Sequence, residues 1–175
     1  MRNTAFLAIG IGLLIVQSNL FRIIGRIHVA GITPSLLLPL IVFMGVHEYS
    51  MARGAALAFL LGYLLDLFAA APVGLFTFIT VATFVVARAA GVRLSAQTIL
   101  TKVALAFVFA LLEGVLIVIL TAIFGGDAAR PRALALLVAP HALTTAALAP
   151  LVFALAEKVH TLTITVPRPG EGAAR

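Results

Sequence analysis

The sequence contains no cysteine and no tryptophan, and only 10% of its 175 residues are charged. Without cysteine, the chain cannot form a disulfide, use a thiol nucleophile or bind zinc through thiolates. A soluble domain has charged side chains at about 25% of its positions, so this chain cannot cover itself with a water-facing surface. Instead, 63% of its residues are hydrophobic. These proportions predict an all-α integral membrane protein.

The hydrophobic residues form runs of the length that crosses a bilayer, which is about 20 residues for a helix. The runs predict six transmembrane helices, over residues 5–21, 29–46, 54–70, 74–88, 103–124 and 133–156. Pro34 inside the second run predicts a kink or a late helix start. We therefore expect one membrane domain over residues 1–157 and a polar cytoplasmic tail over residues 158–175.

The third and fourth runs belong to one apolar stretch, residues 54–87, that is too long for a single helix. We place the break at Pro72 and Gly74, because proline ends a helix and glycine permits a turn. Both resulting spans are short, so a re-entrant segment in place of two crossings is an alternative.

The basic residues, twelve against six acidic ones, predict orientation, because cytoplasmic loops are rich in Lys and Arg. With six spans and a cytoplasmic N-terminus, the inner side holds Arg2, Arg53, Arg88, Arg93, Lys102, Lys158, Arg168 and Arg175. The outer side holds Arg22, Arg26, Arg130 and Arg132. Five spans with an outside N-terminus also give eight basic residues inside and four outside. Both arrangements place the C-terminus in the cytoplasm. This topogenic role explains the positive charge without nucleic-acid binding. The first apolar run exceeds a signal-peptide core and lacks a cleavage site, which favours a retained helix.

Two spans carry small residues on one face, a pattern that lets helix backbones approach closely in lipid. The third span has, at four-residue steps, Gly54, Ala58, Gly62 and Asp66. The fifth span has Ala106, Ala110 and Gly114. We call these the third-span ridge and the fifth-span ridge. They favour either packing within the chain or a surface for a partner subunit.

Three ionisable residues lie inside predicted spans, namely Asp66, Glu113 and His141, where a charge costs about 2.5–3.5 kcal/mol. Asp66 lies near the outer end of its span and could cap the following turn or meet outer arginines, and binding a ligand or carrying a proton is the alternative. Glu113 and His141 are at similar depths in neighbouring antiparallel spans, so we hypothesise that they contact each other. Separate hydrogen bonds to Thr144 or Thr145 are the alternative.

The histidines and acids show no metal-ligand spacing and no nucleophile–base cluster. The sequence therefore predicts no catalytic, metal or cofactor residue, and a non-enzymatic protein.

Residues 62–75 contain Gly62-Tyr-Leu-Leu-Asp66-Leu followed by Pro72-Val-Gly74-Leu. This pattern resembles that of the rod shape-determining MreD family, Gly-x-x-x-Asp-Leu and then Pro-hydrophobic-Gly-Leu. The last span, ending in Ala149-Pro150-Leu151-Val152-Phe153-Ala154-Leu155, is also similar to the final helix of that family. The specific motif covers only these few positions. Arg22, Arg26, Glu113 and His141 match no family feature.

The resemblance implies a scaffold of the cell-elongation machinery in the bacterial inner membrane, which maintains rod shape and supports peptidoglycan synthesis without catalysis or cofactor. The implied partners are MreC, the filament protein MreB, a shape/division/sporulation-class glycosyltransferase and a class B penicillin-binding protein. The implied fold is similar to that of the substrate-binding subunits of energy-coupling-factor transporters. A vitamin-binding subunit of such a transporter is the alternative function, although the few polar residues within the spans argue against the pocket that it needs.

Overall fold

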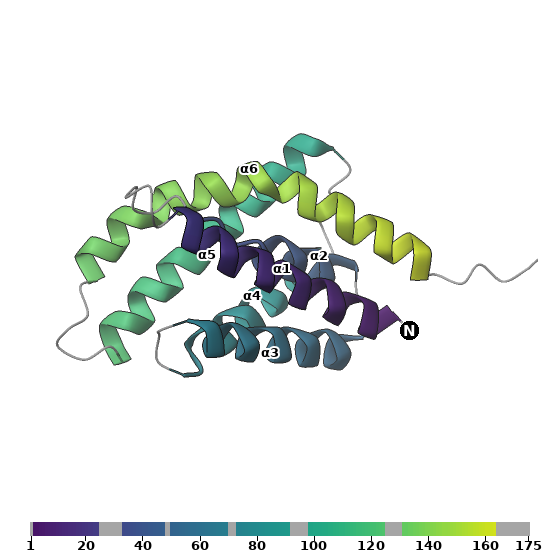
Figure 1. The fold of residues 1–175 in the computed structure, drawn as a ribbon, viewed down its shortest axis with the longest axis horizontal. Helices are drawn as coiled ribbons and strands as arrows, with labels where there is room; N and C mark the ends of the chain where they lie inside the picture. The colour runs from purple at the N-terminus through teal and green to yellow at the C-terminus, as the bar shows by residue number, and fades with distance from the viewer. Residues whose placement is uncertain are drawn as a thin grey trace, which may run out of the picture.

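The structure is a computed structural model that describes residues 2–24, 33–47, 50–69, 73–91, 98–124 and 131–163. Over these residues the chain forms only helices, as predicted. They are α1 (Arg2–Ile24), α2 (Leu37–His47), α3 (Met51–Phe68), α4 (Leu75–Gly91), α5 (Ile99–Phe124) and α6 (Pro131–Thr163). Figure 1 shows α6 running along the length of the molecule, with α1 and α3 in front of α2 and α4.

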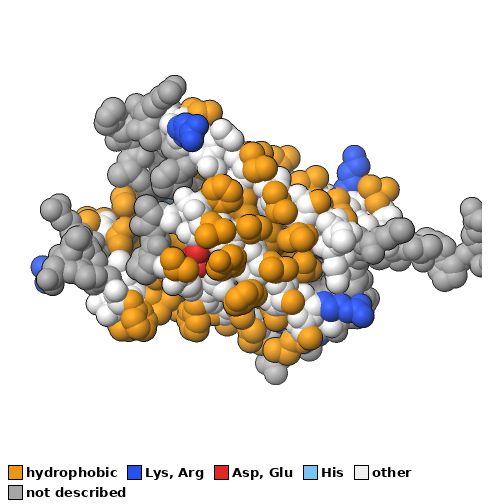
Figure 2. All heavy atoms as spheres, turned by 60° about the horizontal axis from the view of Figure 1, so that its bottom comes forward, with side chains coloured by type: hydrophobic (Ala, Val, Ile, Leu, Met, Phe, Trp, Pro, Cys, Tyr) orange, Lys and Arg blue, Asp and Glu red, His pale blue; other side chains and the backbone are white. Residues whose placement is uncertain are grey.

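Four of these helices, α1, α3, α5 and α6, are long and apolar enough to cross a membrane. On one face of the molecule, hydrophobic side chains cover the middle and the visible Lys and Arg side chains lie towards the margins (Figure 2). The protein is therefore a membrane protein. The helices α2 and α4 have 11 and 17 residues and are shorter, so six crossings stay a prediction.

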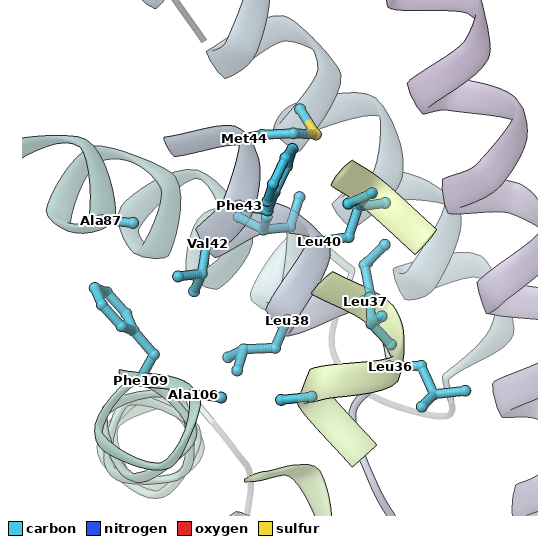
Figure 3. Packing of buried hydrophobic residues seen from close by; sticks show 14 of the residues in the cluster. Leu36, Leu37, Leu38, Leu40, Val42, Phe43, Met44, Ala87, Ala106 and Phe109 are labelled. Carbon is cyan, nitrogen blue, oxygen red and sulfur yellow. The ribbon is translucent and has the colours of Figure 1, made fainter. Parts of the chain in front are cut away.

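The short helix α2 lies at the centre of the core. It begins at Leu37, three residues after Pro34, so the predicted late start is confirmed. All of its residues from Leu37 to Gly45 are buried, as expected for a helix that is hydrophobic on every side. Figure 3 shows its side chains packed among α4, α5 and α6. The first residues of the predicted span, 29–32, lie outside the described residues.

The third-span ridge packs against α4. A Cβ atom added to Gly54 would lie 2.2 Å from the ring of Phe84, and one added to Gly62 would lie 2.1 Å from the Thr80 hydroxyl. Ala58, between these glycines, is completely buried.

The fifth-span ridge packs against α6 in the same way. Ala106 and Ala110 are completely buried, and a Cβ atom on Gly114 would lie 2.5 Å from Val138. Both ridges thus face the chain's own helices, and a partner subunit has no access to them in this arrangement.

Consecutive helices run in opposite directions. An ion pair between Lys102 and Glu157 joins the start of α5 to the end of α6. The ring of Phe6 lies against those of Phe43 and His160, which brings the start of α1 and the ends of α2 and α6 together. We call this the Lys102 end of the molecule. The distribution of basic residues predicts that these segments lie on the cytoplasmic side.

The last helix is longer than its predicted span. It continues to Thr163, so the first six residues of the predicted tail, 158–163, are helical. The tail residues 164–175 lie outside the described residues.

Candidate functional site

The corner between α3 and α4 is organised by Asp66, which is buried with 3% of its surface exposed. Its carboxylate accepts hydrogen bonds from the backbone N–H groups of Gly74 (3.0 Å), Phe76 (2.8 Å) and Thr77 (3.0 Å), and from the Thr77 hydroxyl. The first N–H groups of a helix have no partner within the helix. Asp66 therefore caps α4, which is one of the roles that its position suggested.

Gly62 and Gly74 complete the corner. A Cβ atom on Gly62 would lie 2.8 Å from the Thr77 Cα atom and 3.0 Å from the Phe76 carbonyl oxygen, so only glycine permits this approach. Gly74 has a φ of +97°, a conformation that glycine adopts without the cost that a Cβ atom brings. Pro72 lies outside the described residues. The motif residues 62, 66 and 74 thus build one structural unit.

A second polar cluster surrounds the start of α2, deep inside the molecule. The Gln17 side-chain oxygen of α1 accepts hydrogen bonds from the backbone N–H groups of Leu36 (2.9 Å) and Leu37 (3.3 Å). The Thr145 hydroxyl of α6 accepts one from the Ser35 N–H (3.0 Å). Backbone groups within a bilayer must find partners inside the protein. These side chains therefore allow a helix to begin in the apolar interior of the protein.

Glu113 and His141 belong to the same cluster, and the predicted contact between them is confirmed. The Glu113 Oε2 atom lies 3.8 Å from the His141 Nε2 atom, and Oε1 accepts a hydrogen bond from the Ser35 hydroxyl at 3.4 Å. The His141 Nδ1 atom lies 2.6 Å from the Thr33 carbonyl oxygen. Because a carbonyl oxygen only accepts, Nδ1 is the donor. The Thr144 hydroxyl bonds instead to the backbone of its own helix.

Cysteine crosslinking tests this contact cleanly, because the natural sequence contains no cysteine. We expect a short bifunctional thiol reagent, which bridges the length lost with the two side chains, to join the pair Glu113→Cys and His141→Cys in native membranes. The pair Glu113→Cys and Leu143→Cys is the matched control, because the Leu143 side chain is 61% exposed and lies about 200° around the helix from His141. Equal crosslinking of both pairs, or of neither, would contradict the arrangement of α5 and α6.

Beside this cluster lies a cavity of about 620 Å³, a volume within the range of small-molecule sites. Its polar lining consists of Gln17, Ser18, Arg22, Thr33, Ser35, Glu113 and His141. Its apolar lining includes Leu14, Leu65, Phe68, Phe76 and Ile117. These residues come from the end of α1, the end of α3 and the start of α4, so the cavity lies away from the Lys102 end. The cavity is the candidate functional site.

Glu113 and His141 are expected from the sequence, whereas Gln17, Ser35 and the cavity itself emerge only from the structure. Gln17 stands out in the sequence as an amide within an apolar run, so its position was a usable signal. Among the described residues, no group of three or more His, Asp or Glu side chains is arranged to hold a metal ion.

Comparisons with known proteins give no relative from which the function of the cavity could be inferred. No family model matches the chain, and neither the curated proteins nor the solved structures contain a significant match.

Proposed function

We propose that the protein is a non-enzymatic scaffold of the MreD type, which supports cell elongation in the inner membrane of a rod-shaped bacterium. In this proposal the chain crosses the membrane six times, with both termini in the cytoplasm. Its direct partner is MreC, and through MreC it associates with MreB, the glycosyltransferase and the penicillin-binding protein named above.

The observation that carries the proposal is the α3–α4 corner. The resemblance depends on four residues, and the three that lie among the described residues act together there. Gly62 permits the contact between the helices, Asp66 caps α4, and Gly74 supplies the positive φ. A corner of this kind needs these residue types at these spacings, which supports a family motif over a chance match.

The small-residue ridges do not suit the partner contact of such a scaffold, because they are covered within the chain. Because α4 and α6 cover the two small-residue ridges, we place the contact with the MreC transmembrane anchor on outward-facing side chains of the long helices. Many of these are large and apolar, such as Phe59 in α3 and Val108 in α5, which are 53% and 60% exposed. Such side chains suit van der Waals packing against another helix in lipid.

Depletion and affinity isolation in the source bacterium test this function. We expect cells depleted of the protein to lose their rod shape, and MreC to co-purify with the tagged protein from a mild detergent extract. The control is an unrelated multi-pass membrane protein with the same tag. Rod-shaped depleted cells, together with no enrichment of MreC, would refute the scaffold proposal.

A second candidate function is the solute-binding subunit of an energy-coupling-factor type transporter, and the cavity is the observation that favours it. Although few polar residues lie within the spans, the structure gathers seven of them around one space. This function requires a small molecule that is retained when the protein is purified from its own membrane. Native mass spectrometry would detect such a molecule together with the ATPase subunits of a transporter.

A further inference from the structure

We infer that the cavity binds an amphiphile whose anionic phosphate ester lies at Arg22 and whose alkyl part lies against the apolar lining. Anionic membrane lipids and free alkyl phosphates share this chemistry. The inference goes beyond the proposed scaffold function and does not depend on it, so either can fail without the other.

The α1 side of the cavity carries hydrogen-bond donors that the protein does not use itself. Ser18 and Arg22 are four residues apart and therefore share one face of the helix, and both are exposed and line the cavity. Among the described residues, neither has a hydrogen-bond or ion-pair partner. The Gln17 side-chain oxygen is occupied by the Leu36 N–H group, which leaves its amide nitrogen as a third donor. A guanidinium group accompanied by two neutral donors suits a phosphate.

The other polar groups of the lining bond to one another. The Ser35 hydroxyl donates to Glu113, and His141 Nδ1 donates to the Thr33 carbonyl oxygen. Glu113 and His141 form an ion pair when the ring is protonated, so their charges compensate each other within the protein. Arg22 is therefore the one charged side chain in the described lining that lacks a partner. An anion supplies that partner.

The apolar lining defines the rest of the ligand. It extends from Phe68, which is 62% exposed, to Leu14, which is 3% exposed, so the cavity reaches from the surface into the core. Leu14 lies about 12 Å along α1 from Arg22, and Phe76 and Ile117 add further apolar surface. A phosphate without an alkyl group would leave this surface uncovered, whereas an alkyl group removes it from water. The site therefore favours an amphiphile over a free phosphate ion.

Three soluble probes test the inference in micelles of an uncharged detergent. Hexyl phosphate carries the anion and the alkyl group, inorganic phosphate lacks the alkyl group, and 1-hexanol lacks the anion. We expect titration calorimetry to give a Kd for hexyl phosphate at least about tenfold below that of either other probe, the factor that ~1.4 kcal/mol represents. Arg22→Gln removes the charge and should abolish the advantage over 1-hexanol. Arg132→Gln is the matched control and should keep it, because Arg132 is exposed near the start of α6 and does not line the cavity.

A lipid arm separates the two sources of the ligand. If the ligand is a membrane lipid, nanodiscs with phosphatidylglycerol should raise the Tm above that in phosphatidylcholine nanodiscs, in the natural protein and in Arg132→Gln but not in Arg22→Gln. If the ligand is a free solute, the soluble probes discriminate and the two lipids give the same Tm.

Ser18→Asp is a second variant that leaves Arg22 in place. It puts a carboxylate one turn from the guanidinium group, where it competes with the anion and repels it, so it should also abolish the advantage of hexyl phosphate. Equal affinity for hexyl phosphate and 1-hexanol, together with an equal Tm in both lipids, would overturn the inference. So would inorganic phosphate that binds as tightly as hexyl phosphate, or an advantage that survives in a folded Arg22→Gln or Ser18→Asp protein.

Discussion

Replacing Asp66 with alanine is expected to destabilise the protein by about 1.5–5 kcal/mol, the sum of a lost helix cap at ~0.5–2 kcal/mol and buried donors left unpaired at ~1–3 kcal/mol. The carboxylate accepts four hydrogen bonds, three of them from backbone N–H groups: that of Gly74, just before α4, and those of Phe76 and Thr77 in its first turn. Asp66 is buried, with 3% of its surface exposed, so in the variant water cannot easily replace the carboxylate. The start of α4 should therefore detach from α3.

Thermal unfolding of the purified protein in detergent, followed by circular dichroism at the helix band, measures this effect. Thr77→Val is the matched control, because it removes the hydroxyl donor and leaves the three backbone bonds in place. It should cost about 1.5–3 kcal/mol, the value of one hydrogen bond to a charged group, and less than Asp66→Ala costs. A Tm for Asp66→Ala equal to that of the natural protein, or a larger loss in Thr77→Val, would show that Asp66 does not cap α4.

Much of the fold could be predicted because apolar runs and helix breakers leave clear signals in a sequence. The break between α3 and α4 falls where Gly74 permits a turn, and α2 starts just after Pro34. The contact between Glu113 and His141 followed from their equal depth in neighbouring antiparallel helices. In each case the signal is local, or it depends only on the rise per residue of a helix.

The cavity could not be predicted, because it depends on where α2 begins in space. The segment before α2 enters the middle of the molecule, and its backbone is held there by side chains from α1 and α6. These residues are more than fifteen positions apart from it in the sequence, and no local pattern joins them. The ridges were ambiguous for a related reason. A stripe of small residues shows that another helix approaches, but it does not show whether that helix belongs to the same chain.

Gly62→Ala resolves this ambiguity, because the two interpretations predict changes of opposite sign in the Tm of the isolated protein. In the structure, the new methyl group would lie 2.1 Å from the Thr80 hydroxyl and 2.8 Å from the Thr77 Cα atom. The hydroxyl is itself held by the Ala58 and Phe76 carbonyl oxygens, and a backbone atom cannot move without moving α4. Overpacking of this kind costs about 1–3 kcal/mol. We therefore expect a clear fall in the Tm of the purified protein.

If the Gly62 face were instead open to a partner subunit, the isolated protein would gain stability from the same substitution, since alanine favours a helix by about 1 kcal/mol over glycine. Gly12→Ala provides that reference within the same chain, because no atom lies within 4 Å of its added Cβ position. It should leave the Tm unchanged or raise it slightly. A Gly62→Ala protein that melts like Gly12→Ala, yet no longer co-purifies with the proposed partner MreC, would return the third-span ridge to the partner surface. A fall in Tm for Gly62→Ala alone fixes the ridge inside the molecule, where its close approach lets Asp66 reach the first turn of α4.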